Sequence, residues 1–144
     1  MTDPFNLQRF VDAQAPVYPQ VVSELAAGRK QSHWMWFVFP QIAGLGLSPT
    51  SVCFAISSLD EAKAYVAHPV LGPRLVECAE LALLTQVSNA HEIFGAVDAM
   101  KFRSSMTLFA NAAPETALFQ QCLDKYFGGV PDPQTRVKLA CAEL

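Results

Sequence analysis

The sequence predicts an all-α protein, a single compact domain of seven or eight helices with a glycine-containing loop after an aromatic block. Of its 144 residues, 51% are hydrophobic and only 16% are charged, which is typical of a globule that buries much of its length. Apolar residues recur at spacings of three and four along most of the chain, as they do on the inner face of a helix. A chain of this length fits one domain. We therefore expect residues 1–144 to form one helical domain.

Capping residues and helix breakers divide the first part of the chain. Asp3 is placed to cap a helix over residues 5–15, because its carboxylate can accept backbone N–H groups that have no partner inside the helix. Two prolines then interrupt the helical spacing, and Gly28 ends a second predicted helix over residues 18–27.

The rest of the chain carries similar signals. A serine cap, Ser57 or Ser58, opens the third predicted helix, and the pair His68-Pro69 ends it. The later helical segments are residues 59–67, 70–84, 88–94, 96–110, 114–127 and 133–142, and the segment 70–84 has a clear apolar face. Only residues 52–56 have strand character, and one short strand does not make a sheet.

Residues 29–41, which we call the aromatic block, form the most informative segment. They hold both tryptophans of the chain, and two cations, a hydroxyl and an imidazole lie beside five large apolar side chains. Polar groups beside such a cluster are partly desolvated, which can tune their charge states. Residues 33–39 fit either a short helix or a buried strand, and residues 41–51 read as a glycine-containing loop. The block therefore marks the expected position of a site.

Ten residues form the candidate site, and they come from the aromatic block and from two later helices. We expect His33 to be the proton carrier, because an imidazole titrates near neutral pH. The expected ligand-binding residues, which offer cations, hydroxyls, an amide and indole rings, are Arg29, Lys30, Trp34, Trp36, Gln41, Arg74, Lys101, Ser104 and Ser105.

Each assignment has a structural alternative. Asp98 and Lys101 can pair at a spacing of three, and the two following serines can bond back along the helix. Arg74 can serve a structural carboxylate, and cations at the end of the second helix suit its macrodipole. Whether His68 and Asp98 belong to the site stays open at this stage.

Several classes of site and partner are not supported by the sequence. The four cysteines and three histidines show no metal-ligand spacing, and Gly44-Leu45-Gly46 fits neither a dinucleotide nor a P-loop fingerprint. We therefore predict no metal and no cofactor. The net charge of −3 and scattered cations argue against general nucleic-acid binding. Without an apolar span, a leader sequence or paired cysteines, the expected location is the cytoplasm, away from any membrane.

Several motifs resemble a bacterial and fungal family known as domain of unknown function 1810. The motifs that carry the resemblance are Leu7-x-Arg9-Phe10, residues 28–37, Phe39-Pro40-Gln41, Gly44-Leu45-Gly46, residues 68–75 and residues 94–109. The resemblance implies a small, helical, intracellular protein without an established activity. Some members bear a calpastatin label, but a disordered inhibitor is polar and charge-rich, unlike this chain. A Leu-Gly-x-Arg element followed by Lys-Phe-Arg is also similar to the NADAR family, which is associated with ADP-ribose or riboside chemistry.

These observations support three functional hypotheses. The leading one is a polar pocket for a small anionic or nucleotide-like ligand, related to ADP-ribose or N-glycosides. It leaves open whether the pocket catalyses a reaction or only binds. The second is a protein-interaction module that uses the tryptophan-rich segment. The third is a buried polar network that holds the helices in register and binds no ligand. The oligomeric state stays open.

Overall fold

The structure is a computed structural model that describes the backbone of residues 3–142 and the side chains of residues 3–140. This part of the chain forms nine helices and no strand, which confirms the all-α prediction. The helices, in chain order, are α1 (Gln8–Gln14), α2 (Tyr18–Ala26), α3 (Met35–Val38), α4 (Pro49–Cys53), α5 (Leu59–Ala67), α6 (Leu71–Leu84), α7 (Ala90–Ala112), α8 (Ala117–Phe127) and α9 (Pro133–Ala142).

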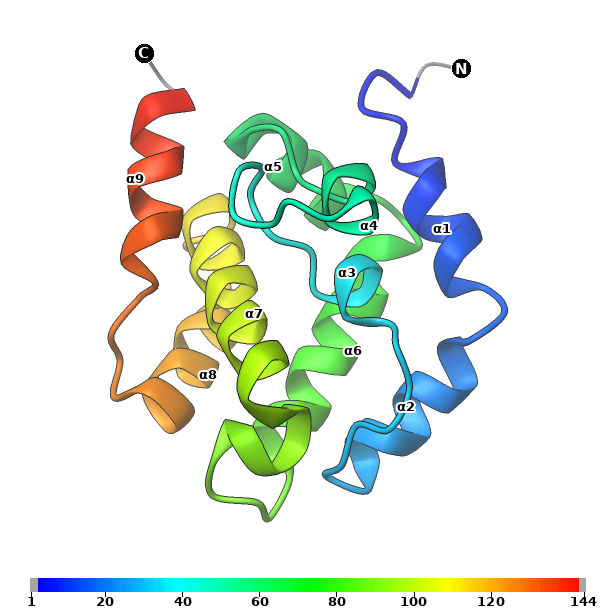
Figure 1. Cartoon of the computed structure of the whole chain (residues 1–144), viewed down its shortest axis with the longest axis vertical. Coiled ribbons are helices and arrows are strands. Elements are labelled where there is room, and N and C mark those ends of the chain that lie inside the picture. The colour runs from blue at the N-terminus through cyan, green and yellow to red at the C-terminus, as the bar shows by residue number, and fades with distance from the viewer. Residues whose placement is uncertain (1–2, 143–144) are drawn as a thin grey trace.

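Helix α7 organises the fold. It packs against α8, α5, α9 and α3, while α6 packs against α8, α2 and α5. In Figure 1, α1 and α2 lie along one side of the molecule and α8 and α9 along the other, with α6 and α7 between them. Because α3 lies against α7, the aromatic block faces the central helix.

The core consists mainly of aromatic rings. Phe10 meets Tyr65 edge-on with centroids 5.1 Å apart, and Phe39 meets Phe102 in the same way at 5.0 Å. All four of these residues are fully buried. Burying a ring of this size contributes roughly 1.5–3 kcal/mol, and edge-to-face pairs add specific geometry. The aromatic block thus supplies core residues as well as site candidates.

Two local predictions differ from the structure. The strand predicted over residues 52–56 is wrong, because residues 49–53 form α4 and only Ile56 makes an isolated parallel bridge, with Ile42. Helix α4 begins inside the predicted loop, since the Ser48 side chain accepts the N–H of Ser51 as an N-cap. The two helices predicted over residues 88–94 and 96–110 are joined in α7, with a kink at Gly95.

Helix α1 also begins later than predicted. Asp3 accepts the N–H groups of Leu7 and Gln8 at 2.8 and 3.0 Å, as a capping carboxylate does. Asn6, however, has a φ of 53°, which is outside the helical region, so regular helix starts only at residue 8. These hydrogen bonds lower the pKa of Asp3.

Arg9 on α1 ties together three segments of the fold. Its guanidinium donates to Glu61 on α5 at 2.9 Å, and that carboxylate side chain is only 3% exposed. It also donates, at 2.6–2.9 Å, to the carbonyl oxygens of Phe5, Asn6, Cys53 and Ala55. Since every donor nitrogen is used, Arg9 fixes the start of α1 and the end of α4 against α5.

Gly72 explains one of the motifs noted in the sequence. A Cβ built on Gly72 would lie 2.1 Å from the backbone carbonyl oxygen of Val66. The start of α6 therefore passes against the end of α5 at a distance that only glycine permits. No helix in the described part of the chain is long and apolar enough to cross a bilayer.

Candidate functional site

The first half of the aromatic block is held by a buried carboxylate that sequence analysis missed. Glu24 on α2 accepts the Trp34 indole N–H at 3.0 Å, the Ser32 hydroxyl at 2.5 Å, and the N–H groups of Gln31 and Ser32. Burial acts to raise the pKa of this carboxyl, but the four hydrogen bonds outweigh it and lower the pKa to about 2. Glu24 is therefore an anion that fixes the direction in which the block leaves α2.

This arrangement determines the role of Trp34. The indole is 1% exposed, its N–H points at Glu24, and the ammonium of Lys30 lies 5.1 Å from its ring centre. Trp34 is therefore part of the core and offers no stacking face to a ligand. The predicted role of Trp34 in binding is not compatible with this position.

Trp36, two residues later, has a different environment. It is partly exposed, and the Lys101 ammonium lies 4.9 Å from its ring centre. Within the described residues, the indole N–H of Trp34 has a hydrogen-bond partner whereas that of Trp36 has none. A half-buried indole N–H normally finds a partner, so Trp36 presents an unused donor.

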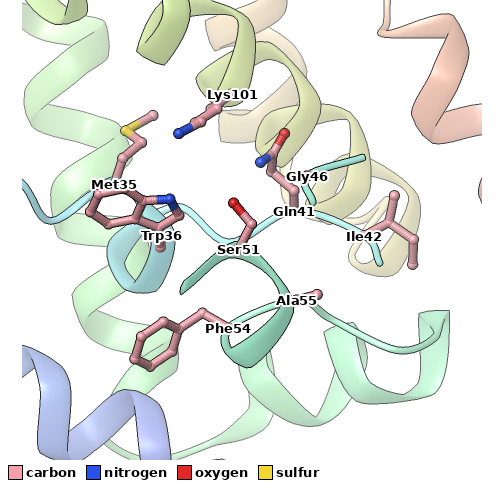
Figure 2. Close-up of a pocket in the computed structure, with 9 residues that line it drawn as sticks. All are labelled: Met35, Trp36, Gln41, Ile42, Gly46, Ser51, Phe54, Ala55 and Lys101. Carbon is pink, nitrogen blue, oxygen red and sulfur yellow. The ribbon is translucent and has the colours of Figure 1, made fainter. Parts of the chain in front are cut away.

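The polar ends of four side chains face a common space beside α7. Figure 2 shows the ammonium of Lys101, the amide of Gln41 and the hydroxyl of Ser51 around it, with the indole nitrogen of Trp36 on the same side. They come from three segments, namely the aromatic block, α4 and α7. The Ser51 hydroxyl already contacts the Ser48 hydroxyl at 2.9 Å. The arrangement concentrates hydrogen-bond donors, which suits an anion.

An ion cluster lies next to this space. Asp98 pairs with Lys30 at 2.8 Å and with Lys101 at 3.6 Å. Two cations and one anion leave the cluster with one net positive charge. The longer distance to Lys101, whose side chain is 21% exposed, leaves its ammonium available to a ligand. The i, i+3 pair considered from the sequence is thus present, and Asp98 belongs to the site.

Three hollows along α7 share lining residues, and together we call them the α3–α7 groove. Met35 and Trp36 line both the first and the middle hollow, and Gln41, Gly46 and Lys101 line both the middle and the last. The two outer hollows have volumes of about 370 and 250 Å³, while the middle one measures about 10 Å³. The middle therefore holds about one water molecule, and Lys101 is one of the residues that line it.

The groove contains six of the ten candidate residues, namely Lys30, His33, Trp36, Gln41, Lys101 and Ser104. His33 is exposed and lines the first hollow together with Gly95 and Asp98. Ser104 is 6% exposed, and its hydroxyl contacts the Met100 carbonyl at 3.1 Å and Asp132 at 3.3 Å. It therefore borders the last hollow mainly as part of a structural network.

The other four candidates lie outside the groove; one of them is the buried Trp34 described above. Arg74 stacks over the ring of Tyr18 at 4.7 Å and contacts Gln14 at 3.4 Å, so it serves the junction of α1, α2 and α6. Ser105 is fully buried, and its hydroxyl has no hydrogen-bond partner in the described structure. Arg29 is exposed and lines none of the three hollows. We expected Arg74 to lie beside His33 and Lys101. This expectation is wrong, because Arg74 packs against Tyr18 instead.

Sequence reasoning missed several groove residues, chiefly Met35, Ser51 and Val97. For Ser51 the sequence held a usable signal. Ser48-Pro49 is typical of a helix start, so Ser51 could have been placed in the first turn of a helix rather than in a loop. Met35 and Val97 gave none, since apolar residues beside a core do not indicate which face is exposed. Among the described side chains, no group of three or more His, Cys, Asp or Glu residues is close enough to hold a metal ion.

Comparison with known proteins gives three findings. The crystal structure of the conserved hypothetical protein Rv1873 from Mycobacterium tuberculosis matches with a TM-score of 0.94 and 56% sequence identity, over 96% of this chain and 99% of that one. A search of curated proteins finds no match. The profile of DUF1810, a family described as proteins of unknown function, matches residues 4–139. The chain therefore belongs to the DUF1810 family.

Proposed function

We propose that the α3–α7 groove binds a small anionic, nucleotide-like ligand. The observation that carries the proposal is the set of donors from Lys101, Trp36, Gln41 and Ser51 around one space. Donors converging on a recessed site favour a phosphate or carboxylate, because each can give a charge-assisted hydrogen bond. The adjoining cluster with one net positive charge supports the same ligand charge.

The shape of the groove supports an elongated ligand. The middle has room for only about one water molecule, so a phosphate would enter it once the Lys101 ammonium moves away from the Trp36 ring. The freed ring face could then stack on a base. The outer hollows would take the two ends of the molecule. ADP-ribose has phosphates between a base-bearing end and a ribose end, so it is our first candidate. We place this binding in the cytoplasm. His33 would supply the proton carrier if a bound N-glycoside is cleaved.

The positions of the tryptophans favour a small ligand over a protein partner. An interaction surface would expose both indoles on a flat face, whereas Trp34 is buried and Trp36 lines a concave groove. The buried-network hypothesis accounts well for Glu24, Ser32 and Trp34. It does not account for the unused donors around Lys101.

The proposal predicts binding that depends on Lys101. Thermal shift and calorimetry with ADP-ribose, AMP and ribose 5-phosphate should reveal saturable binding. A ligand at one hundred times its Kd would stabilise the fold by about 2.7 kcal/mol. Lys101→Met should weaken binding about tenfold or more, since it removes a charged hydrogen bond. Uncharged adenosine should bind much more weakly than AMP.

Lys63→Met is the matched control, because Lys63 is exposed on α5 and lines none of the hollows. It should bind every probe as the wild type does. Equal affinity of wild type and Lys101→Met for AMP and ADP-ribose would contradict the proposed role of the groove, as would the lack of any thermal shift with all three anionic probes.

A further inference from the structure

A second groove lies between α7 and α9, and it shares no lining residue with the α3–α7 groove. Its volume is about 570 Å³, within the range of pockets that hold small organic ligands. It is lined by two arginines and by apolar residues, namely Arg103, Val130, Pro131, Pro133, Arg136, Val137 and Ala140. Val130 and Val137 are more than half exposed. The lining is therefore apolar with cations as its only charged groups.

The two arginines have no acidic partner in the described structure. Arg103 donates through Nε to the Val130 carbonyl and through Nη2 to the Pro131 carbonyl, both at 3.1 Å. These bonds fix its guanidinium at the groove wall and leave Nη1 unused. Arg136 is exposed on α9, and neither arginine lies within salt-bridge distance of a described carboxylate.

The nearest acid in sequence is already engaged. The Asp132 carboxylate is buried and accepts the N–H and hydroxyl of Thr135 at 2.9 and 2.6 Å, as the cap of α9. It faces Ser104 and the last hollow of the α3–α7 groove. The chain as a whole has a net charge of −3, but the only charged residues that line this groove are two arginines. The groove is therefore suited to an anionic ligand.

We propose that this groove binds a small amphipathic carboxylate, with its apolar tail along Val130 and Val137 and its carboxylate on Arg136 and Nη1 of Arg103. A planar guanidinium matches a carboxylate in geometry and charge, and burial of the tail supplies the driving force. The proposal does not depend on the function of the α3–α7 groove.

Calorimetry on the full chain with octanoate tests the proposal. Octanoate should bind saturably with one site, octan-1-ol about tenfold more weakly because it lacks the charged hydrogen bonds, and acetate without measurable heat. Arg136→Gln should weaken octanoate binding about tenfold. Val137→Asp, which puts a negative charge beside the tail, should abolish it.

Val52→Asp is the matched control, since Val52 is 63% exposed against 57% for Val137 and lines neither groove. It should leave octanoate binding unchanged, and so should Lys101→Met, which separates this site from the α3–α7 groove. Equal binding of octanoate and octan-1-ol would overturn the proposal.

Discussion

Replacing Arg9 with methionine should lower the free energy of unfolding by roughly 3–5 kcal/mol, the cost of breaking a buried ion pair from one side. The change leaves the Glu61 carboxylate buried with only its Ser57 contacts and removes the donor from four backbone carbonyls. Those carbonyls hold the start of α1 and the end of α4. Urea unfolding followed by circular dichroism would measure the change.

Arg29→Met is the control for this prediction, because Arg29 is exposed and its side chain has no partner in the described structure. It should change stability by less than about 0.5 kcal/mol. The double variant Arg9→Met, Glu61→Gln should recover part of the loss, since no unpaired charge then stays buried. A loss for Arg9→Met no larger than that of the control would contradict the assigned role of the guanidinium.

Replacing Glu24 with glutamine should lower stability at pH 7 by about 3 kcal/mol, the free energy that corresponds to a pKa held near 2 instead of 4.5. Because the pKa is lower in the folded state than in the unfolded state, this stabilisation is complete above about pH 5. It is lost as the pH falls from there towards 2. The difference between wild type and Glu24→Gln should therefore be largest at neutral pH and should shrink towards pH 2.

Glu80→Gln provides the comparison, since Glu80 is exposed on α6. It should differ from wild type by less than about 0.5 kcal/mol at neutral pH. Chemical unfolding at five or six pH values would give all three curves. A constant gap between wild type and Glu24→Gln from pH 7 to pH 2 would show that the carboxylate charge is not what stabilises the block.

Apolar spacing and capping residues predicted the helices well where a helix spans several turns. Helical spacing and caps located α2, α5 and α6 to within one residue, because each has an apolar face and a marked end. The prediction failed for residues 52–56, where β-branched residues suggested a strand. The Ser48 cap and Pro49 outweighed that propensity and turned the segment into α4. A run of five residues is too short for spacing to decide between helix and strand.

The site was predictable in part. Chemical type alone indicated Lys30, Trp36 and Lys101, which line the α3–α7 groove, because cations lie beside aromatic residues there in a weakly charged chain. It could not separate Trp36 from Trp34, since the difference depends on Glu24, which reads as an ordinary surface residue of α2. Arg74 was misplaced for a similar reason, as its partner Tyr18 lies 56 positions away in the sequence. Pairings between distant segments leave no local signal.

The contrast between the two indoles gives the protein a built-in pair of optical reporters. The buried Trp34 indole is shielded from collisional quenchers such as acrylamide until the chain unfolds. The Trp36 indole, beside Lys101, is accessible to solvent. Fluorescence from Trp34 would therefore report on the folded state, whereas fluorescence from Trp36 would report on ligand binding in the groove. Binding and denaturation can thus be separated spectroscopically in a chain with no added label.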